Sequence, residues 1–338
     1  MAPPPRKRQR RKPILSTPTP TRRAKAPFVA RPADSSTRAS HVLDWLLRKL
    51  PPRQREKAHD YLVLTRMDRP IGALLLLWPT WWALWLAAGD WPPLKPLVIF
   101  TLGVFAMRTA GCAINDFADR KLDPQVARTA GRPIASGRVT PREALIVFVA
   151  LLAFAFVLVL FTNRLTIELS FAGAALAAIY PFTKRWTYLP QVVLGAAFGW
   201  SIPMAFAAVT GTVPPLGWLL FLANILWSVV YDTEYAMVDR DDDLKVGAKS
   251  TAILFGDADL PILAVLMGTL LLAMLFVGQR AHLAWPYWLA LLAAVGLFGW
   301  QLWLIRRRER LACLVAFRHN NWWGLVVWLG IVLALAVR

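Results

Sequence analysis

The feature that most constrains this chain is a succession of nine apolar segments, each long enough to cross a lipid bilayer. They lie at roughly 71–89, 96–115, 143–161, 165–182, 190–209, 214–231, 260–278, 286–304 and 322–337. A membrane-spanning helix needs about 20 apolar residues. Of the 338 residues, 57% are hydrophobic and only 17% are charged, whereas about a quarter of the residues in a soluble domain are charged. The sequence therefore predicts an all-α integral membrane protein with nine transmembrane helices.

The connections between these segments differ in charge. The short connections and the chain end together contain four Lys or Arg residues, whereas the longer connections 116–142, 183–189, 232–259 and 305–321 contain sixteen. Cytoplasmic loops of membrane proteins are enriched in Lys and Arg. We therefore expect the long connections and the N-terminus to be cytoplasmic and the C-terminus to lie outside.

The chain begins with a strongly basic region. Residues 1–70 hold 18 of the 39 Lys and Arg and 5 of the 20 acidic residues, so +13 of the net charge of +19 precedes the first apolar segment. Residues 1–40 have a composition that cannot pack a core, and 41–60 have the pattern of an amphipathic helix on the membrane surface that ends at Pro51-Pro52. We expect a disordered basic tail with an interfacial helix (1–60) before a membrane domain (61–338). No nucleic-acid motif is present, so contact with the lipid bilayer is favoured and nucleic acid is not expected.

The 17 tryptophans gather near the ends of the predicted segments, as Trp78, Trp82 and Trp323 do. Tryptophan is typical of the membrane–water interface. We interpret most of them as interfacial anchors, with an isoprenoid groove as the alternative for a minority.

A first polar cluster, Asn115–Asp123, follows the second apolar segment. On a helix that advances about 100° per residue, Asn115, Asp119 and Asp123 fall within about 80° of one another, and Asp116 lies at the margin of that face. Amide and carboxylate oxygens suit Mg²⁺ rather than zinc. Helix capping is the alternative, but acids at a helix C-terminus oppose its dipole. The cluster therefore predicts a metal site.

A second cluster, Asp232–Asp243, follows the sixth apolar segment. Asp232, Asp239 and Asp243 fall within about 40° of one another on a helix, whereas Asp241 and Asp242 point elsewhere. Because Asp232 lies about 10 Å deeper than Asp239, one ion cannot contact all three. We predict that Asp239 and Asp243 hold metal and that Asp232 lies nearer an acceptor or a second ion. An acid at membrane depth is costly and marks a functional site.

Basic residues accompany both clusters. Two facing acidic clusters would repel each other unless divalent ions and a diphosphate lay between them. Arg66, Arg128, Arg132 and Lys184 are candidates for contact with the phosphate oxygens, with an ordinary cytoplasmic charge as the alternative for each. Arg108 lies inside an apolar segment, so it needs an anion, either a cluster carboxylate or a substrate group.

Other metal and nucleotide chemistry finds no support in the sequence. Cys112 and Cys313 are far apart, and the four histidines show no metal-ligand spacing. The chain contains neither a His-Glu-x-x-His nor a Gly-x-x-x-x-Gly-Lys-Ser/Thr pattern, which disfavours zinc hydrolases and P-loop enzymes.

Four ordered motifs run through the chain. Two of them are Asn115-Asp-x-x-Asp-x-x-x-Asp123, followed by Arg128-Thr-x-x-Arg-Pro-Ile-Ala-Ser-Gly137, and Tyr231-Asp-Thr-x-Tyr-Ala-Met-Val-Asp239. The others are Arg66-x-Asp-x-Pro-Ile-Gly with Leu-Leu-Trp-Pro-Thr80, and Tyr180-Pro-Phe-x-Lys-Arg185. Together they resemble the signatures of the UbiA-type intramembrane prenyltransferases over roughly residues 60–335. The basic extension 1–60 departs from that pattern.

The Tyr231–Asp239 motif and the Leu-Leu-Trp-Pro-Thr80 string are most similar to the bacterial 4-hydroxybenzoate polyprenyltransferases of ubiquinone synthesis. The resemblance implies transfer of a polyprenyl group from polyprenyl diphosphate to the ring carbon ortho to the hydroxyl of 4-hydroxybenzoate, with Mg²⁺ as cofactor. It also implies a bacterial inner membrane location, a cytoplasmic active site, and nine helices around a central cavity open laterally to lipid.

Residue roles follow from the resemblance and the helical phase together. We expect Asp232 to assist the acceptor and Arg108 to hold its carboxylate. The expected metal ligands are Asn115, Asp119, Asp123, Asp239 and Asp243, and the expected diphosphate ligands are Arg66, Arg128, Arg132 and Lys184. The alternatives are a sister enzyme that acts on naphthoate, homogentisate, chlorophyllide or haem, and a divalent-cation transporter.

Overall fold

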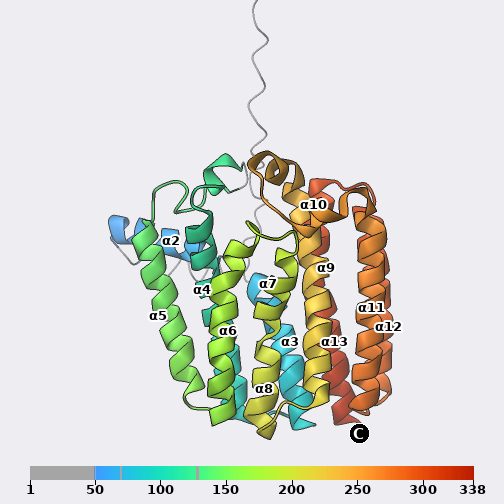
Figure 1. Ribbon diagram of the computed structural model, residues 1–338. Coiled ribbons are helices and arrows are strands. Elements are labelled where there is room, and N and C mark those ends of the chain that lie inside the picture. Colours follow the sequence, from blue (N-terminus) through green and yellow to red (C-terminus); the bar gives the residue numbers. More distant parts are fainter. Residues whose placement is uncertain (1–48, 50, 69–70, 127–128) are drawn as a thin grey trace, which may run out of the picture. The chain divides into compact units, whose positions relative to one another are not determined.

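The computed structural model describes residues 49, 51–68, 71–126 and 129–338, and over these residues it is built from helices without strands (Figure 1). Nine helical segments in this part of the chain are long and apolar enough to cross a membrane. They are α3 (Ile71–Ala88), α4 (Leu94–Asp119), α5 (Pro141–Val159), α6 (Arg164–Thr183), α7 (Pro190–Gly199) joined to α8 (Ser201–Thr210), α9 (Pro215–Val246), α11 (Asp259–Arg280), α12 (Trp285–Ile305) and α13 (Arg310–Ala336). The predicted all-α membrane fold is confirmed.

In the part of the chain that the structure describes, four short elements accompany these long helices. They are α2 (Pro52–Leu64), η1 (Asp123–Gln125), α10 (Thr251–Phe255) and η2 (Gly256–Ala258). Helix α2 begins at Pro52, so the described part of 41–60 is helical after the two prolines, while a helix that ends at Pro51-Pro52 stays a prediction. Proline is well tolerated in the first turn of a helix, where its missing N–H would have no partner. The part of the expected interfacial helix before Pro51, apart from Lys49, lies outside the described residues.

The long helices run side by side, and α9 lies at the centre of their packing (Figure 1). Helix α9 contacts α7, α11 and α13, while α3 packs against α8 and α13, and α4 packs along α5. Helices α4, α6 and α9 all end at the upper face in Figure 1, and the C-terminus lies at the opposite face. The ends of these three helices therefore lie near one another.

The packing centre is aromatic. Trp82, Trp227 and Trp323 are fully buried, with ring centroids 5.1 Å apart for the first pair and 5.2 Å apart for Trp227 and Trp323. The interpretation of Trp82 and Trp323 as interfacial anchors is therefore wrong. Large aromatic side chains bury 150–250 Å² each, so they fill the space between tightly packed helices as well as they anchor helix ends.

Helix α13 begins at Arg310, twelve residues before the predicted start at 322. The added turns carry polar residues that find partners inside the bundle. Asn320 is fully buried, accepts a hydrogen bond from Trp227 Nε1 at 2.9 Å, and donates to Glu234 at 2.8 Å. Because its polar atoms are satisfied by neighbouring helices, this polar stretch is helical and buried rather than a loop.

Candidate active site

The two polar clusters line one cavity of about 170 Å³ between the ends of α4, α6 and α9. Asn115, Asp119 and Asp123 lie on one wall, and Asp232, Asp239 and Asp243 lie on the wall formed by α9. Segments more than a hundred residues apart in sequence thus meet at one end of the helix bundle.

The α9 wall depends on a single uninterrupted helix. Helix α9 runs to Val246 and ends at Gly247, whose φ of 70° is the left-handed conformation that suits glycine. Asp232, Asp239 and Asp243 face the cavity. Asp241 and Asp242 face away from it and pair with Arg310 at 3.0 and 3.2 Å.

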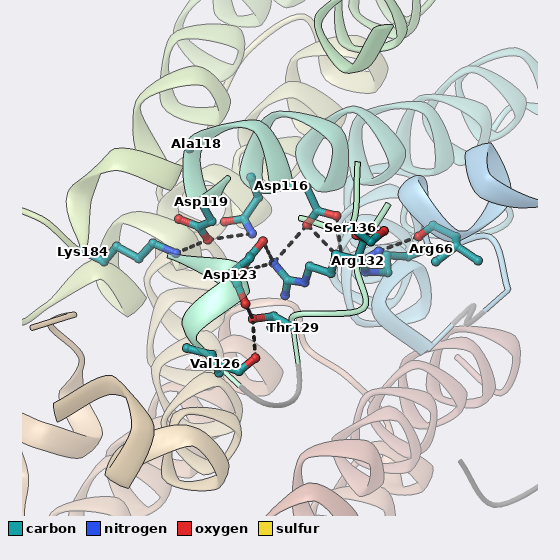
Figure 2. A network of polar contacts seen from close by, with 12 residues as sticks. Arg66, Asp116, Ala118, Asp119, Asp123, Val126, Thr129, Arg132, Ser136 and Lys184 are labelled. Carbon is teal, nitrogen blue, oxygen red and sulfur yellow. Dashed lines mark hydrogen bonds and ion pairs between the residues drawn. The ribbon is translucent and has the colours of Figure 1, made fainter. Parts of the chain in front are cut away.

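The α4 wall is not one helix. Helix α4 ends at Asp119, and Asp123 opens the separate 3₁₀ turn η1, so the assumption of a continuous helix through Asp123 is wrong. Pro124 cannot continue α4, because it has no N–H to donate to the carbonyl four residues earlier and its ring would collide with that carbonyl. The Asp123 carboxylate still reaches the cavity. Thr129 holds the turn by donating its hydroxyl to the Asp123 carbonyl at 2.9 Å (Figure 2).

Asp116 is the centre of a buried ion network (Figure 2). It is 1% exposed and pairs with Arg66 and Arg132, each at 3.0 Å. Arg132 also contacts Asp123 at 3.0 Å, so one guanidinium bridges the two carboxylates. Sequence reasoning placed Asp116 only at the margin of the metal face. The structure makes it the anchor of the loop that carries Arg132.

The four expected diphosphate ligands lie in different places. Arg132 and Lys184 line the cavity, and Lys184 forms an ion pair with Asp119. Arg66 is not among the described residues that line the cavity, and its guanidinium is bound to Asp116. Arg128 lies outside the described residues.

The charge state of Asp123 reflects opposing influences. Burial raises the pKa of the Asp123 carboxyl, the Arg132 guanidinium opposes that shift, and the nearby Asp119 and Asp116 carboxylates add to it. Burial, the largest of these influences, therefore disfavours the charged form of this carboxyl, and a further cation in the cavity would favour it.

The cavity suits a divalent cation that is shared with a phosphorylated ligand. The Asp119 Oδ1 atom is buried and has no hydrogen-bond partner in the structure, while Asp119 Oδ2 accepts from Asn115 at 3.3 Å. Among the described residues, no three His, Cys, Asp or Glu side chains lie close enough to hold one ion. Magnesium is commonly held by one or two carboxylates and completed by substrate phosphates. The donor set therefore fits Mg²⁺ bound together with a diphosphate.

Asp232 and Arg108 lie in the deeper part of the site. Asp232 lines the cavity together with Gln191 and Lys184, whereas Arg108 is not among the described residues that line it. The Arg108 guanidinium lies 5.8 Å from the Phe198 ring centroid, and its Nε is buried without a hydrogen-bond partner. Among the described residues, Arg108 forms no ion pair. A half-buried guanidinium whose buried Nε has an open donor is a ready site for a carboxylate ligand.

Gly72 makes room for the Arg108 side chain, a role that was not predicted from the sequence. A Cβ atom at position 72 would lie 2.6 Å from Arg108 Nε and 2.8 Å from Cζ. Such distances are too short for real contacts. The glycine in the Pro-Ile-Gly motif therefore serves the arginine 36 positions later. Only its place in the motif could have drawn attention to it.

Three further residues line the cavity without having been predicted as site residues, although two of them belong to the quoted motifs. Tyr180, Tyr235 and Gln191 line the cavity. Gln191 is 4% exposed, and its Oε1 accepts a hydrogen bond from the Thr251 backbone at 3.1 Å. The sequence signal for Gln191 was its polar side chain at the start of the apolar segment 190–209. A polar side chain in a membrane segment is costly unless it serves a functional site or finds a hydrogen-bond partner.

A model of the UbiA prenyltransferase family matches residues 76–334. This chain belongs to the UbiA prenyltransferase family. A UbiA relative from Pseudomonas syringae pv. syringae (strain B728a), named 4-hydroxybenzoate octaprenyltransferase, is 59% identical over 292 residues, which is 86% of this chain and 97% of the relative. A protein of the same name from Xylella fastidiosa (strain M23) is 58% identical over 280 residues, 83% of this chain and 94% of the relative.

Solved structures of UbiA homologues have the same fold. The apo structure of a UbiA homologue from Aeropyrum pernix K1 matches with a TM-score of 0.68 at 23% identity, covering 77% of this chain and 97% of that chain. A UbiA homologue from Archaeoglobus fulgidus bound to DMAPP and Mg²⁺ matches with a TM-score of 0.60 at 19% identity, covering 79% and 99%. The predicted family and fold are therefore confirmed.

Proposed function

We propose that this UbiA-family chain transfers a polyprenyl group from polyprenyl diphosphate to 4-hydroxybenzoate, at the ring carbon ortho to the hydroxyl, with Mg²⁺ and with release of diphosphate, in ubiquinone biosynthesis. The observation that carries the proposal is the cavity between α4 and α9, which has carboxylates on two facing walls and an open arginine donor deeper in the bundle. The names of the relatives that are 58–59% identical support the same acceptor. An A. fulgidus homologue bound to DMAPP and Mg²⁺ supports the same donor class.

The donor end of the site is the carboxylate-lined cavity. The ligands proposed for the metal are Asn115, Asp119, Asp123, Asp239 and Asp243. When bound there, Mg²⁺ supplies positive charge that makes the diphosphate a better leaving group. Lys184 and Arg132 already lie on the cavity wall, and their remaining donors bind phosphate oxygens. Arg128 and Arg66 complete the proposed set, with Arg66 acting from behind Asp116.

The acceptor end is proposed to lie between Asp232 and Arg108. Arg108 binds the carboxylate of 4-hydroxybenzoate through its open Nε and so fixes the orientation of the ring. Asp232 assists removal of a proton from the phenol or the ring. The apolar helices around the site keep water from the allylic cation that forms when the diphosphate leaves. The lateral opening to lipid, by which a long prenyl chain would enter, stays a prediction.

The proposed location is the bacterial inner membrane, with the N-terminus and the active site cytoplasmic. The excess of Lys and Arg in the long connections supports this orientation. The cavity lies at the face of the bundle where those connections lie (Figure 1).

A membrane assay with matched variants tests the function. Membranes that contain the protein are incubated with labelled 4-hydroxybenzoate and prenyl diphosphates of several lengths, with Mg²⁺ or with EDTA, and parallel reactions offer other aromatic acceptors. Asp239→Asn should lower the rate by at least about a hundredfold, whereas Asp241→Asn is the same chemical change on the outer face of α9 and should act like wild type. Retention of Mg²⁺-dependent turnover by Asp239→Asn would refute the metal assignment, and a preference for another acceptor would refute the proposed substrate.

A further inference from the structure

A second cavity adjoins the catalytic one. It has a volume of about 380 Å³ and lies between the end of α4, the end of α6 and the segment 246–248 that follows α9. Lys184, Leu122, Val246 and Ala248 belong to the walls of both cavities. The Lys249 backbone N–H donates to the Lys184 carbonyl at 3.1 Å, and this bond ties the shared wall together. The second cavity is thus a neighbouring compartment of the site.

The second cavity is lined by four cations and no described acid. The cations are Arg120, Lys121, Lys184 and Arg185, which we call the basic pocket. Lys184 pairs with Asp119 in the catalytic cavity. Within the part of the chain that the structure describes, the other three form no ion pair. Uncompensated positive charge that lines a concave surface concentrates anions there.

The two arginines are held in place by contacts that leave most of their donors open. The Arg120 guanidinium lies 4.4 Å from the Phe117 ring centroid and donates to the Phe117 carbonyl at 2.8 Å. Arg185 lies 5.4 Å from the Phe182 ring and donates to the Ala118 carbonyl. A guanidinium has five N–H donors in a planar fork. Each arginine is therefore fixed in position with donors left for a ligand.

Helix capping accounts for only part of this cluster. Carbonyls at a helix C-terminus attract cations, and Arg120 and Arg185 serve the end of α4 in that way. Lys121 does not, because its ammonium has no partner among the described residues. Helix capping also does not explain why the basic pocket shares a wall with the catalytic cavity. Lys184 lines both cavities.

We propose that the basic pocket is a metal-independent binding site for diphosphate and the route by which the diphosphate product leaves the catalytic cavity. The proposal rests on the proposed function, since that reaction releases diphosphate at the shared wall. The catalytic cavity is acidic and needs a cation to hold an anion, whereas the basic pocket does not. Lys184 lies between the two compartments and passes the anion from one to the other. A phosphate-bearing lipid headgroup shares this chemistry, but the shared wall favours the product.

The binding test uses the purified full-length protein in EDTA, with inorganic diphosphate as the probe and calorimetry as the readout. Wild type should bind diphosphate without metal. Lys121→Gln combined with Arg185→Gln should weaken this binding by about tenfold or more. If the double variant folds poorly, Lys121→Glu serves instead, because Lys121 is exposed. It should also weaken diphosphate binding. Arg306→Gln with Arg307→Gln removes the same charge from another loop and should leave binding unchanged.

Several results would overturn the proposal. Wild type that binds no diphosphate in EDTA would do so, as would unchanged binding in both Lys121 variants. Loss of binding in phosphatidylglycerol nanodiscs, but not in phosphatidylcholine nanodiscs, would assign the pocket to a lipid headgroup instead. Tighter binding in EDTA by Asp239→Asn, which removes negative charge from the catalytic cavity, together with unchanged binding in the Lys121 variants, would place the diphosphate in the catalytic cavity.

A kinetic test separates release from chemistry. In the Lys121 and Arg185 double variant, steady-state kcat should fall while the single-turnover rate stays at the wild-type value. An equal fall in both rates would refute a release role. The proposed function has its own test, because diphosphate binding in EDTA is measured without turnover. It fails if wild type with Mg²⁺ and polyprenyl diphosphate prenylates no 4-hydroxybenzoate.

Discussion

Gly72→Ala is expected to impair use of the acceptor while the protein stays folded. The added Cβ would lie 2.6 Å from Arg108 Nε, whereas ordinary contacts begin at 3.4 Å. The guanidinium must therefore move by about 1 Å, a shift of the size that a close-packed interior transmits to its neighbours. Because the obstructing atoms belong to the end of a flexible side chain, the shift costs little stability. Replacing glycine by alanine also favours a helix by about 0.5–1 kcal/mol.

The functional cost is larger than the cost in stability. A displacement of about 1 Å in a positioning group can lower a rate by about a hundredfold, and loss of one charge-assisted hydrogen bond costs about 1.5–3 kcal/mol. We expect kcat/KM for 4-hydroxybenzoate to fall by about 10- to 100-fold, mostly through KM. The KM for prenyl diphosphate should stay near the wild-type value, since the donor cavity is untouched.

The assay compares Gly72→Ala with a matched glycine variant. Gly103→Ala, in α4, places its Cβ where nothing lies within 4 Å, so its acceptor kinetics and thermal unfolding should match those of wild type. An unchanged acceptor KM in Gly72→Ala would refute the contact between Arg108 and the acceptor carboxylate. A large loss of thermal stability would refute the argument that Arg108 can move cheaply.

Three further outcomes follow from the structure. Glu234→Leu should lower the free energy of unfolding by about 1–3 kcal/mol, because it removes one of the two acceptors of the buried Asn320 amide and leaves only the Ala316 carbonyl. Glu234→Gln, whose carbonyl can accept the same bond, should be nearly neutral, and equal thermal unfolding of the two variants would contradict this account. Arg132→Gln should destabilise the fold by about 3–5 kcal/mol, since it removes a cation shared by the buried Asp116 and Asp123; unchanged denaturation would show that Arg66 suffices for Asp116. EDTA should abolish prenyl transfer and added Mg²⁺ should restore it, because acidic walls alone repel a diphosphate; EDTA-resistant turnover would refute the metal requirement.

The membrane fold was predictable because apolar length is a local property. Nine apolar segments predicted the nine helices long enough to span a membrane in the described part of the chain. The helical phase of Asp232, Asp239 and Asp243 predicted that they share one face, and the continuous helix α9 has them on the cavity wall. The phase argument failed for Asp123, because α4 ends at Asp119 ahead of Pro124 and the 3₁₀ turn η1 brings the Asp123 carboxylate to the cavity. The same local signal misjudged α13, because its polar residues are satisfied only by partners on other helices.

What the sequence determined by itself is the membrane character, the order of the spans, the family resemblance and the identity of the two acidic clusters, because all of these depend on residue types and on spacing along one helix. Only the tertiary structure decided that Asp116 anchors Arg66 and Arg132, that Gly72 makes room for Arg108, and that Trp82 and Trp323 are buried. Each of these contacts joins segments that are distant in sequence. A local sequence pattern does not specify which distant side chain will pair with a charge or pack against a residue.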